Sequence, residues 1–129
     1  MTIAIIGAMP QEINRLTDEM HNIEETTIAG RTYYQGQLHQ QDVVIVYSHI
    51  GKVAAAITAT TLIIRFKVER IIFIGVAGAA NPALNVGDIV IADKLIQHDM
   101  NASPLFPRFE IPLTGLTTFP VSQIAQNDL

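Results

Sequence analysis

Short apolar runs separated by turns divide the chain into segments with either a strand or a helix pattern. Runs rich in β-branched residues predict strands at residues 2–6, 26–28, 32–38, 43–47, 71–74 and 89–92. Apolar residues at helical spacing predict one helix from Pro10, with Ile13, Leu16 and Met20 on its apolar face, and a second helix over residues 52–67. This order of strands and helices predicts an α/β fold, with a sheet of about six strands and at most two helices.

The last third of the chain has a looser pattern. Several prolines predict a loop between residues 103 and 112, because each proline restricts the residue before it. Val121, Ile124 and Ala125 predict the beginning of a helix. His98 and Asp99 are interpreted as a turn rather than as catalytic groups.

The run 71–74 reads Ile-Ile-Phe-Ile, which predicts a strand that is covered on both faces. A sheet of about six strands that contains such a strand needs helices on both of its faces. The two predicted helices are too few to cover both faces. The composition agrees, with 49% hydrophobic and 16% charged residues against about 25% charged in average domains. We therefore expect a single domain over residues 1–129 that lacks part of its cover, either a partner half or a subunit interface.

Charge and composition exclude several classes of function. A net charge of −4 with only 8 Lys and Arg residues argues against a nucleic-acid partner. No apolar run approaches the ~20 residues of a membrane span, and no charged leader precedes the first strand, so we expect a cytoplasmic protein. The four histidines lack metal-ligand spacing and cysteine is absent, so neither a metal nor a cofactor is expected.

Three sequence blocks and one turn carry the functional signal. The first block is IIGAMPQE at residues 5–12, the second is SHIGKVAAA at 48–56, and the third is VGDIVIAD at 86–93. The turn is GVAG at 75–78, directly after an apolar strand. Its small residues allow a ligand to approach the backbone at the strand's carboxyl end, although simple tight packing explains them too.

In this order and spacing the blocks resemble the purine nucleoside phosphorylase and nucleosidase superfamily, and within it the bacterial 5′-methylthioadenosine/S-adenosylhomocysteine nucleosidases. The resemblance implies a three-layer, mixed sheet flanked by helices, here apparently truncated to the N-terminal half. It also implies hydrolysis of an N-ribosyl bond with release of adenine. In that family two essential carboxylates, in a Met-Glu and a Ser-Asp pair, lie in the second half. Neither dipeptide occurs here, so we expect this chain alone to lack the general acid and to be nearly inactive.

Glu12 is the residue that the resemblance identifies as catalytic, through activation of the attacking water. A carboxylate near a water suits this reaction, because it orients and deprotonates the nucleophile and offsets positive charge on the sugar. Without the resemblance, Glu12 is better explained by the helix macrodipole, which favours a carboxylate in the first turn. A phosphorylase would need to hold phosphate. Because no arginine precedes Arg15 and Glu12 would repel phosphate, water is the expected nucleophile.

The resemblance also assigns substrate-binding positions. Apolar residues suit a thioether, and those matching the sugar and 5′-alkylthio pocket are Ala8, Met9 and Ile50, although Met9 fits a core position equally well. The residues expected to lie against the sugar and the purine are Val76, Ala77 and Gly78. The nucleosidases often have serine at the position of Val76. An adenine nucleoside thioether is thus the expected small-molecule partner.

Leu105 and Phe106 fall in the loop that, in the family, reaches the neighbouring subunit's pocket, so a homodimer is expected. The family usually has an aromatic residue at the position of Leu105, and Phe106 supplies one shifted by a single residue. Two alternatives stay open for the chain as a whole. It acts as a non-catalytic half-domain that assembles with another copy or another protein, or it belongs to a related purine nucleoside hydrolase or phosphorylase.

Overall fold

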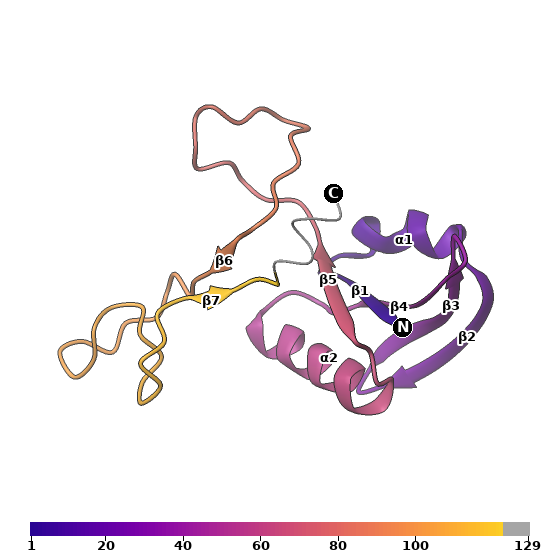
Figure 1. The fold of residues 1–129 in the computed structure, drawn as a ribbon, viewed down its shortest axis with the longest axis horizontal. Coiled ribbons are helices and arrows are strands. Elements are labelled where there is room, and N and C mark those ends of the chain that lie inside the picture. The colour runs from indigo at the N-terminus through magenta and orange to yellow at the C-terminus, as the bar shows by residue number, and fades with distance from the viewer. Residues whose placement is uncertain (123–129) are drawn as a thin grey trace. The chain divides into compact units, whose positions relative to one another are not determined.

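Five strands form the main sheet of the protein, in the spatial order β2-β3-β4-β1-β5 (Figure 1). The computed structural model describes residues 1–122, and the chain divides into two units, Met1–Gly78 and Ala79–Leu129. The strands of the first unit are β1 (Ile3–Gly7), β2 (His21–Ile28), β3 (Arg31–Leu38), β4 (Gln41–Tyr47) and β5 (Arg70–Ile74). β1 lies parallel to both β4 and β5, whereas β3 runs antiparallel to both of its neighbours, β2 and β4.

The first unit has one helix on each face of this sheet (Figure 1). These helices are α1 (Pro10–Asp18) and α2 (Lys52–Arg65). Leu62 of α2 packs against Ala4 and Ile6 of β1, while Ile13 of α1 packs with Ile45 on the other face. Successive residues of a strand point to opposite faces, so an apolar strand between two helices builds both cores at once. The result is the expected three-layer α/β arrangement.

β5 forms where the sequence predicted it, but it is not covered on both faces. Ile71, Ile72 and Phe73 are 37%, 39% and 59% exposed. Among the described residues β5 pairs only with β1 and therefore lies at the edge of the sheet. The prediction of a doubly covered strand is thus wrong for the described part of the chain, because β5 has a strand partner on one side only and these side chains stay partly exposed.

The second unit contains a two-stranded antiparallel ribbon and long loops. Its strands are β6 (Lys94–Leu95) and β7 (Phe119–Pro120). The strand predicted at 89–92 is absent, and Ile89 and Val90 are 91% and 67% exposed. An extended segment becomes a strand only by pairing, and within residues 1–122 no strand pairs with this one. Of the helix predicted from Val121, the residues after 122 lie outside the described part of the chain.

Candidate active site

The candidate active site lies at the carboxyl ends of three adjacent parallel strands. Gly7, the last residue of β1, pairs with Tyr47 at the end of β4 and with Ile74 at the end of β5. The segments 8–9, 48–51 and 75–78 therefore leave the sheet at the same edge. Ligands of open α/β sheets bind outside the carboxyl ends of the strands. This edge carries all of the predicted site residues of the first unit.

Glu12 extends across this edge and connects two of the strand ends. Pro10 begins α1 immediately after β1, which places Glu12 in the first helical turn with its side chain directed back toward the strand. Its Oε2 accepts hydrogen bonds from the backbone N–H groups of Ala8, at 2.7 Å, and Met9, at 2.9 Å. Its Oε1 accepts one from the N–H of Val76, at 3.1 Å, just beyond β5.

These hydrogen bonds keep the Glu12 carboxyl ionised. The Met9 N–H has the largest effect and lowers the pKa of Glu12, while burial opposes it and the Val76 and Ala8 N–H groups lower the pKa further. The net result is a pKa below the usual glutamate value. The macrodipole of α1 acts in the same direction. At neutral pH the edge therefore presents a fixed negative charge.

The hydrogen bonds to Glu12 leave one of its oxygens partly free. A carboxylate oxygen accepts about two hydrogen bonds. Oε2 already accepts from Ala8 and Met9, whereas Oε1 accepts only from Val76 among the described residues. Oε1 thus retains an acceptor position for a water or a hydroxyl group. The sequence identified Glu12, but it could not show that three backbone amides hold the carboxylate in place.

Two glycines allow Glu12 to lie this close to the strands. A Cβ at Gly75 would lie 2.7 Å from Glu12 Oε1. A Cβ at Gly7 would lie 2.6 Å from Ile13 Cγ2 and 3.1 Å from Glu12 Cβ. Real Cβ atoms essentially never make contacts under 3.0 Å, so a side chain at either position would force these neighbouring atoms to shift. Sequence reasoning noted Gly7 only within the first sequence block and Gly75 only as part of a turn.

Ser48 is a second residue that the sequence did not single out. It is 1% exposed and joins the end of β4 to the end of β1. Its N–H donates to the Gly7 carbonyl at 2.9 Å, and its Oγ donates to the same oxygen at 3.2 Å or to the His49 carbonyl at 2.9 Å. In the sequence, the only indication of this role is that Ser48 stands between an apolar strand and a turn that contains glycine. Its hydrogen bonds fix the strand end that carries Ile50.

The other predicted positions of the first unit surround the same edge. Ala8 and Met9 are half-buried, and Met9 belongs to neither of the two core clusters, which disfavours its alternative assignment as a core residue. Ile50 and Val76 are 76% and 81% exposed. Ala77 and Gly78 are exposed as well. An exposed apolar rim beside a carboxylate suits an apolar ligand with a polar centre, and the individual binding roles stay predictions.

Leu105 and Phe106 belong to the second unit. Both backbone N–H groups donate to the Ala102 carbonyl, at 3.1 and 3.2 Å, so the two residues lie in a tight loop. Leu105 is 84% exposed and Phe106 is half-buried. His98 lies in a turn closed by the Met100 N–H and the Gln97 carbonyl, as its interpretation as a turn residue predicted. The contribution of the loop to a neighbouring subunit stays a prediction.

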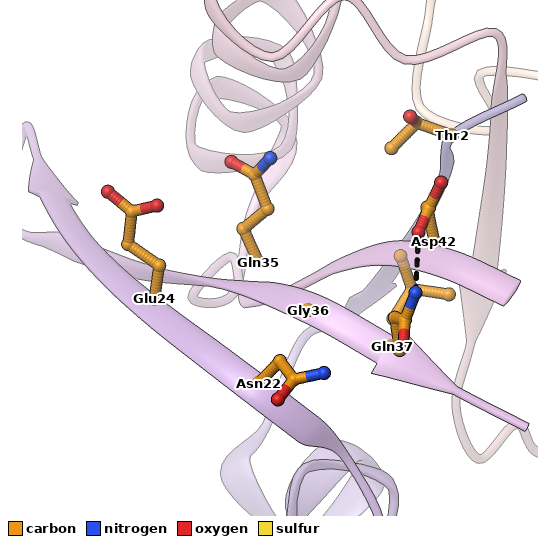
Figure 2. A pocket seen from close by; sticks show the side chains of 8 residues that line it. Thr2, Asn22, Glu24, Gln35, Gly36, Gln37 and Asp42 are labelled. Atoms are coloured by element: carbon orange, nitrogen blue, oxygen red, sulfur yellow. Dashed lines mark hydrogen bonds between the residues drawn. The ribbon is translucent and has the colours of Figure 1, made fainter. Parts of the chain in front are cut away.

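A hollow of about 370 Å³ lies at the other end of β1 and β4 (Figure 2). Figure 2 shows Thr2 before β1, Asp42 in β4 and Gln37 near the end of β3, with the Gln37 amide donating to Asp42 at 3.4 Å. Most of the residues that line it are polar; the full lining is Thr2, Asn22, Glu24, Gln35, Gly36, Gln37, Asp42 and Val43. Ligand pockets are mostly apolar, so this hollow does not suit a purine nucleoside.

Two negative observations apply to residues 1–122. No group of three or more His, Cys, Asp or Glu side chains is placed to hold a metal ion in this part of the chain. None of the helices described there has the length and apolar character needed to cross a membrane.

Fold, site and sequence together identify the family. The chain belongs to the phosphorylase superfamily, whose family model matches residues 2–128. Within that family it is similar to the 5′-methylthioadenosine/S-adenosylhomocysteine nucleosidase of Tolumonas auensis, with 44% identity over 103 residues. That match covers 80% of this chain and 45% of the relative. The chain therefore spans less than half the length of this relative.

Solved structures of this family have the same fold. The nucleosidase of Colwellia psychrerythraea in complex with adenine is 39% identical, with a TM-score of 0.89 over 93% of this chain and 50% of that one. The futalosine hydrolase of Helicobacter pylori is 31% identical, with a TM-score of 0.90 over 97% of this chain and 54% of that one. The expected fold class is thus confirmed, and the chain spans about half the length of each of these two structures.

Proposed function

We propose that the protein hydrolyses the N-ribosyl bond of 5′-methylthioadenosine and S-adenosylhomocysteine and releases adenine. The observation that carries this proposal is the Glu12 carboxylate, which backbone amides hold at the carboxyl ends of three parallel strands with one acceptor position open on Oε1. The names of the similar proteins supply the substrate class, and the Colwellia relative binds adenine. The same proposal places the protein in the cytoplasm and in methionine salvage.

In this mechanism Glu12 acts on the water and on the charge of the sugar. Cleavage of the bond between ribose and adenine passes through a cation-like sugar, which the fixed negative charge stabilises. Oε1 accepts a hydrogen bond from the water and aims its oxygen at the anomeric carbon. A carboxylate of low pKa is a weak base, so the proton moves to Glu12 only as the water oxygen bonds to carbon and becomes acidic.

Water suits this site better than phosphate as the nucleophile. Phosphate would meet the negative charge of Glu12, which accepts hydrogen bonds but cannot donate any while ionised. Arg31, whose Nε donates to the Ser48 carbonyl at 3.1 Å, also directs Nη1 to the Ala29 carbonyl at 2.8 Å. Two of its donors thus serve the backbone rather than an anion. We therefore propose a hydrolase rather than a phosphorylase.

Apolar side chains at the strand ends recognise the substrate in this proposal. Ala8, Met9 and Ile50 contact the ribose and the 5′-alkylthio group, and the segment Val76, Ala77 and Gly78 lies against the sugar and the purine. Leu105 and Phe106 close the pocket of a neighbouring subunit in a homodimer. The group that protonates adenine belongs to the part of the family's fold that this chain does not span.

The decisive experiment measures adenine release by the native protein that carries this sequence, purified from its source. Glu12→Gln should lower kcat by about 10²–10⁴-fold, the usual contribution of acid–base assistance. Glu19→Gln is the matched control, because Glu19 is an exposed carboxylate at the end of the same helix, and it should retain full activity. The sugar product should be the free 5-thio-substituted ribose, formed without phosphate.

Two results would contradict the proposal. The first is a strict phosphate requirement with a sugar 1-phosphate as the product, and the second is full activity of Glu12→Gln. Adenine release at a normal enzymatic rate by protein that ends at Leu129 would instead contradict the separate expectation that this chain alone is nearly inactive. Turnover of methylthioadenosine, adenosine and futalosine, compared at equal concentration, tests the substrate, since the Helicobacter relative is a futalosine hydrolase.

A second candidate function is that of a half-domain that acts by assembly. The exposed apolar side chains of the edge strand β5 favour it, since such an edge readily accepts another strand. Its occupant would be the second half of this fold, supplied by a longer chain or as a separate polypeptide. Size-exclusion chromatography of the 129-residue chain tests this candidate, and a stable, well-behaved monomer would count strongly against it.

A further inference from the structure

Gly75 is in contact with the Glu12 carboxylate rather than with open space. It lies between Ile74, the last residue of β5, and Val76, whose N–H donates to Glu12 Oε1. A Cβ built on Gly75 would lie 2.7 Å from Oε1, 3.2 Å from Cδ and 3.5 Å from Oε2 of Glu12. The carboxylate thus occupies the space where the side chain of any other residue would begin.

We propose that Gly75 is a positioning residue for Glu12, because its missing Cβ lets the carboxylate lie against the end of β5 with Oε1 on the Val76 N–H. The catalytic consequence rests on the proposed function, since Oε1 is the oxygen that would hold the water. The positioning itself is a property of the fold and can be tested without any substrate.

Glu12 cannot retreat from a side chain at this position without losing a hydrogen bond. To reach ordinary contact with a new Cβ, Oε1 would have to move from 2.7 Å to at least 3.4 Å. The other oxygen is held by Ala8 and Met9 at 2.7 and 2.9 Å, so the carboxylate would rotate about Oε2. That rotation lengthens the bond from Val76, which is already 3.1 Å, and moves the open acceptor position.

The next glycine in the same turn has different surroundings. A Cβ at Gly78 would meet nothing within 4 Å. The missing side chains of the two glycines in this turn therefore have different consequences. Gly78 leaves space on the exposed side, where a ligand can approach, whereas the space at Gly75 is filled by the protein's own carboxylate.

The first test titrates the Glu12 side-chain carboxyl by ¹³C NMR in the native protein and in Gly75→Ala. The pKa of Glu12 should rise in Gly75→Ala, because the Val76 hydrogen bond that favours the charged form is weakened. Gly78→Ala is the matched control, and it should leave the titration of Glu12 unchanged. An unaltered Glu12 pKa in folded Gly75→Ala would overturn the proposal.

The second test asks whether Gly75 acts through Glu12. Gly75→Ala should lower kcat by about 10–100-fold, as expected for a misplaced catalytic group. In the Glu12→Gln background the same substitution should add less than about 3-fold, because residues that act as a unit are not additive. Equal losses in both backgrounds would overturn the proposal. If no adenine is released at all, the proposed function fails, whereas the titration still decides the positioning.

A third variant covers the case in which Gly75→Ala does not fold. Glu12→Ala removes the carboxylate that the new Cβ would meet, so the double variant should fold and Gly75→Ala should be less destabilising there than in the native background. Failure of the double variant to fold, while Glu12→Ala alone folds, would show that glycine is required at this position for another reason and would overturn the proposal.

Discussion

β4 and β5 are both apolar parallel neighbours of β1, yet they have opposite surroundings. Val43 of β4 is 3% exposed, and the three residues after it are 0% exposed. In β5, by contrast, Phe73 is 59% exposed. β4 has β3 on its outer side and helices over both faces, whereas β5 pairs only with β1 in the described part of the chain. These two apolar runs both form strands, but neighbouring elements decide that only β4 becomes part of the core.

The two strands also differ in how their carboxyl ends are held. Ser48 ties the end of β4 to the Gly7 carbonyl through its backbone N–H. The end of β5 is tied through a side chain, because the Val76 N–H donates to Glu12. The turn after β5 is therefore joined to the turn between β1 and α1 through the candidate catalytic residue. This connection makes the edge strand and the active site sensitive to the same substitutions.

The largest expected effect comes from truncating equivalent isoleucines in the two strands. Ile45→Ala in β4 should lower the free energy of unfolding by about 2–5 kcal/mol, because it leaves a cavity in a fully buried site. Ile72→Ala in β5, where the side chain is 39% exposed, should cost about 1 kcal/mol or less. Urea unfolding of the 129-residue chain measures both, and equal costs would show that β5 is covered in solution.

A smaller effect is expected from the tie between Glu12 and Val76, and it depends on pH. Because the folded pKa of Glu12 is lowered, its contribution to stability is complete above the usual glutamate pKa and is lost as pH falls through the folded value. Glu12→Gln should cost about 1–2 kcal/mol at pH 7, since its amide nitrogen must face a backbone N–H. The variant should also lose less stability than the native chain on acidification.

The measurement is thermal unfolding from neutral pH down into the acid range, with Glu19→Gln as the control. Glu19 is paired only at the surface, with Arg15 at 3.4 Å and His39 at 3.4 Å, where ion pairs contribute little. If Glu12→Gln and Glu19→Gln give the same pH dependence, the backbone amides do not hold Glu12 as the structure shows.

The smallest expected change in stability comes from Phe73 at the exposed edge. Phe73→Thr should change the free energy of unfolding by only about 0.5 kcal/mol, because most of the side chain is already exposed. It should, however, reduce self-association of the chain, since it removes apolar area from an unpaired strand. Light scattering over a range of concentrations measures this, and Ile23→Thr on β2, at the opposite edge of the sheet, is the control.

Sequence reasoning succeeded where local signals and burial agree. It located the strands that became β1 and β4, the helix that begins at Pro10, and α2, which ends at Arg65 rather than at residue 67. It missed the first half of β2, because residues 21–25 are mostly polar and become a strand only by pairing with β3. It also predicted a strand at 89–92 that has no partner among the described residues.

By itself the sequence determined which segments are apolar, where α1 begins and that Glu12 follows a strand end, because periodicity and capping act over a few residues. Only the tertiary structure decided that β5 lies at an edge and that Ser48 joins two strands. It alone showed that Gly75 makes room for a carboxylate 63 positions earlier in the chain. These features depend on contacts between segments that lie far apart in the sequence, and a local sequence pattern does not specify such contacts.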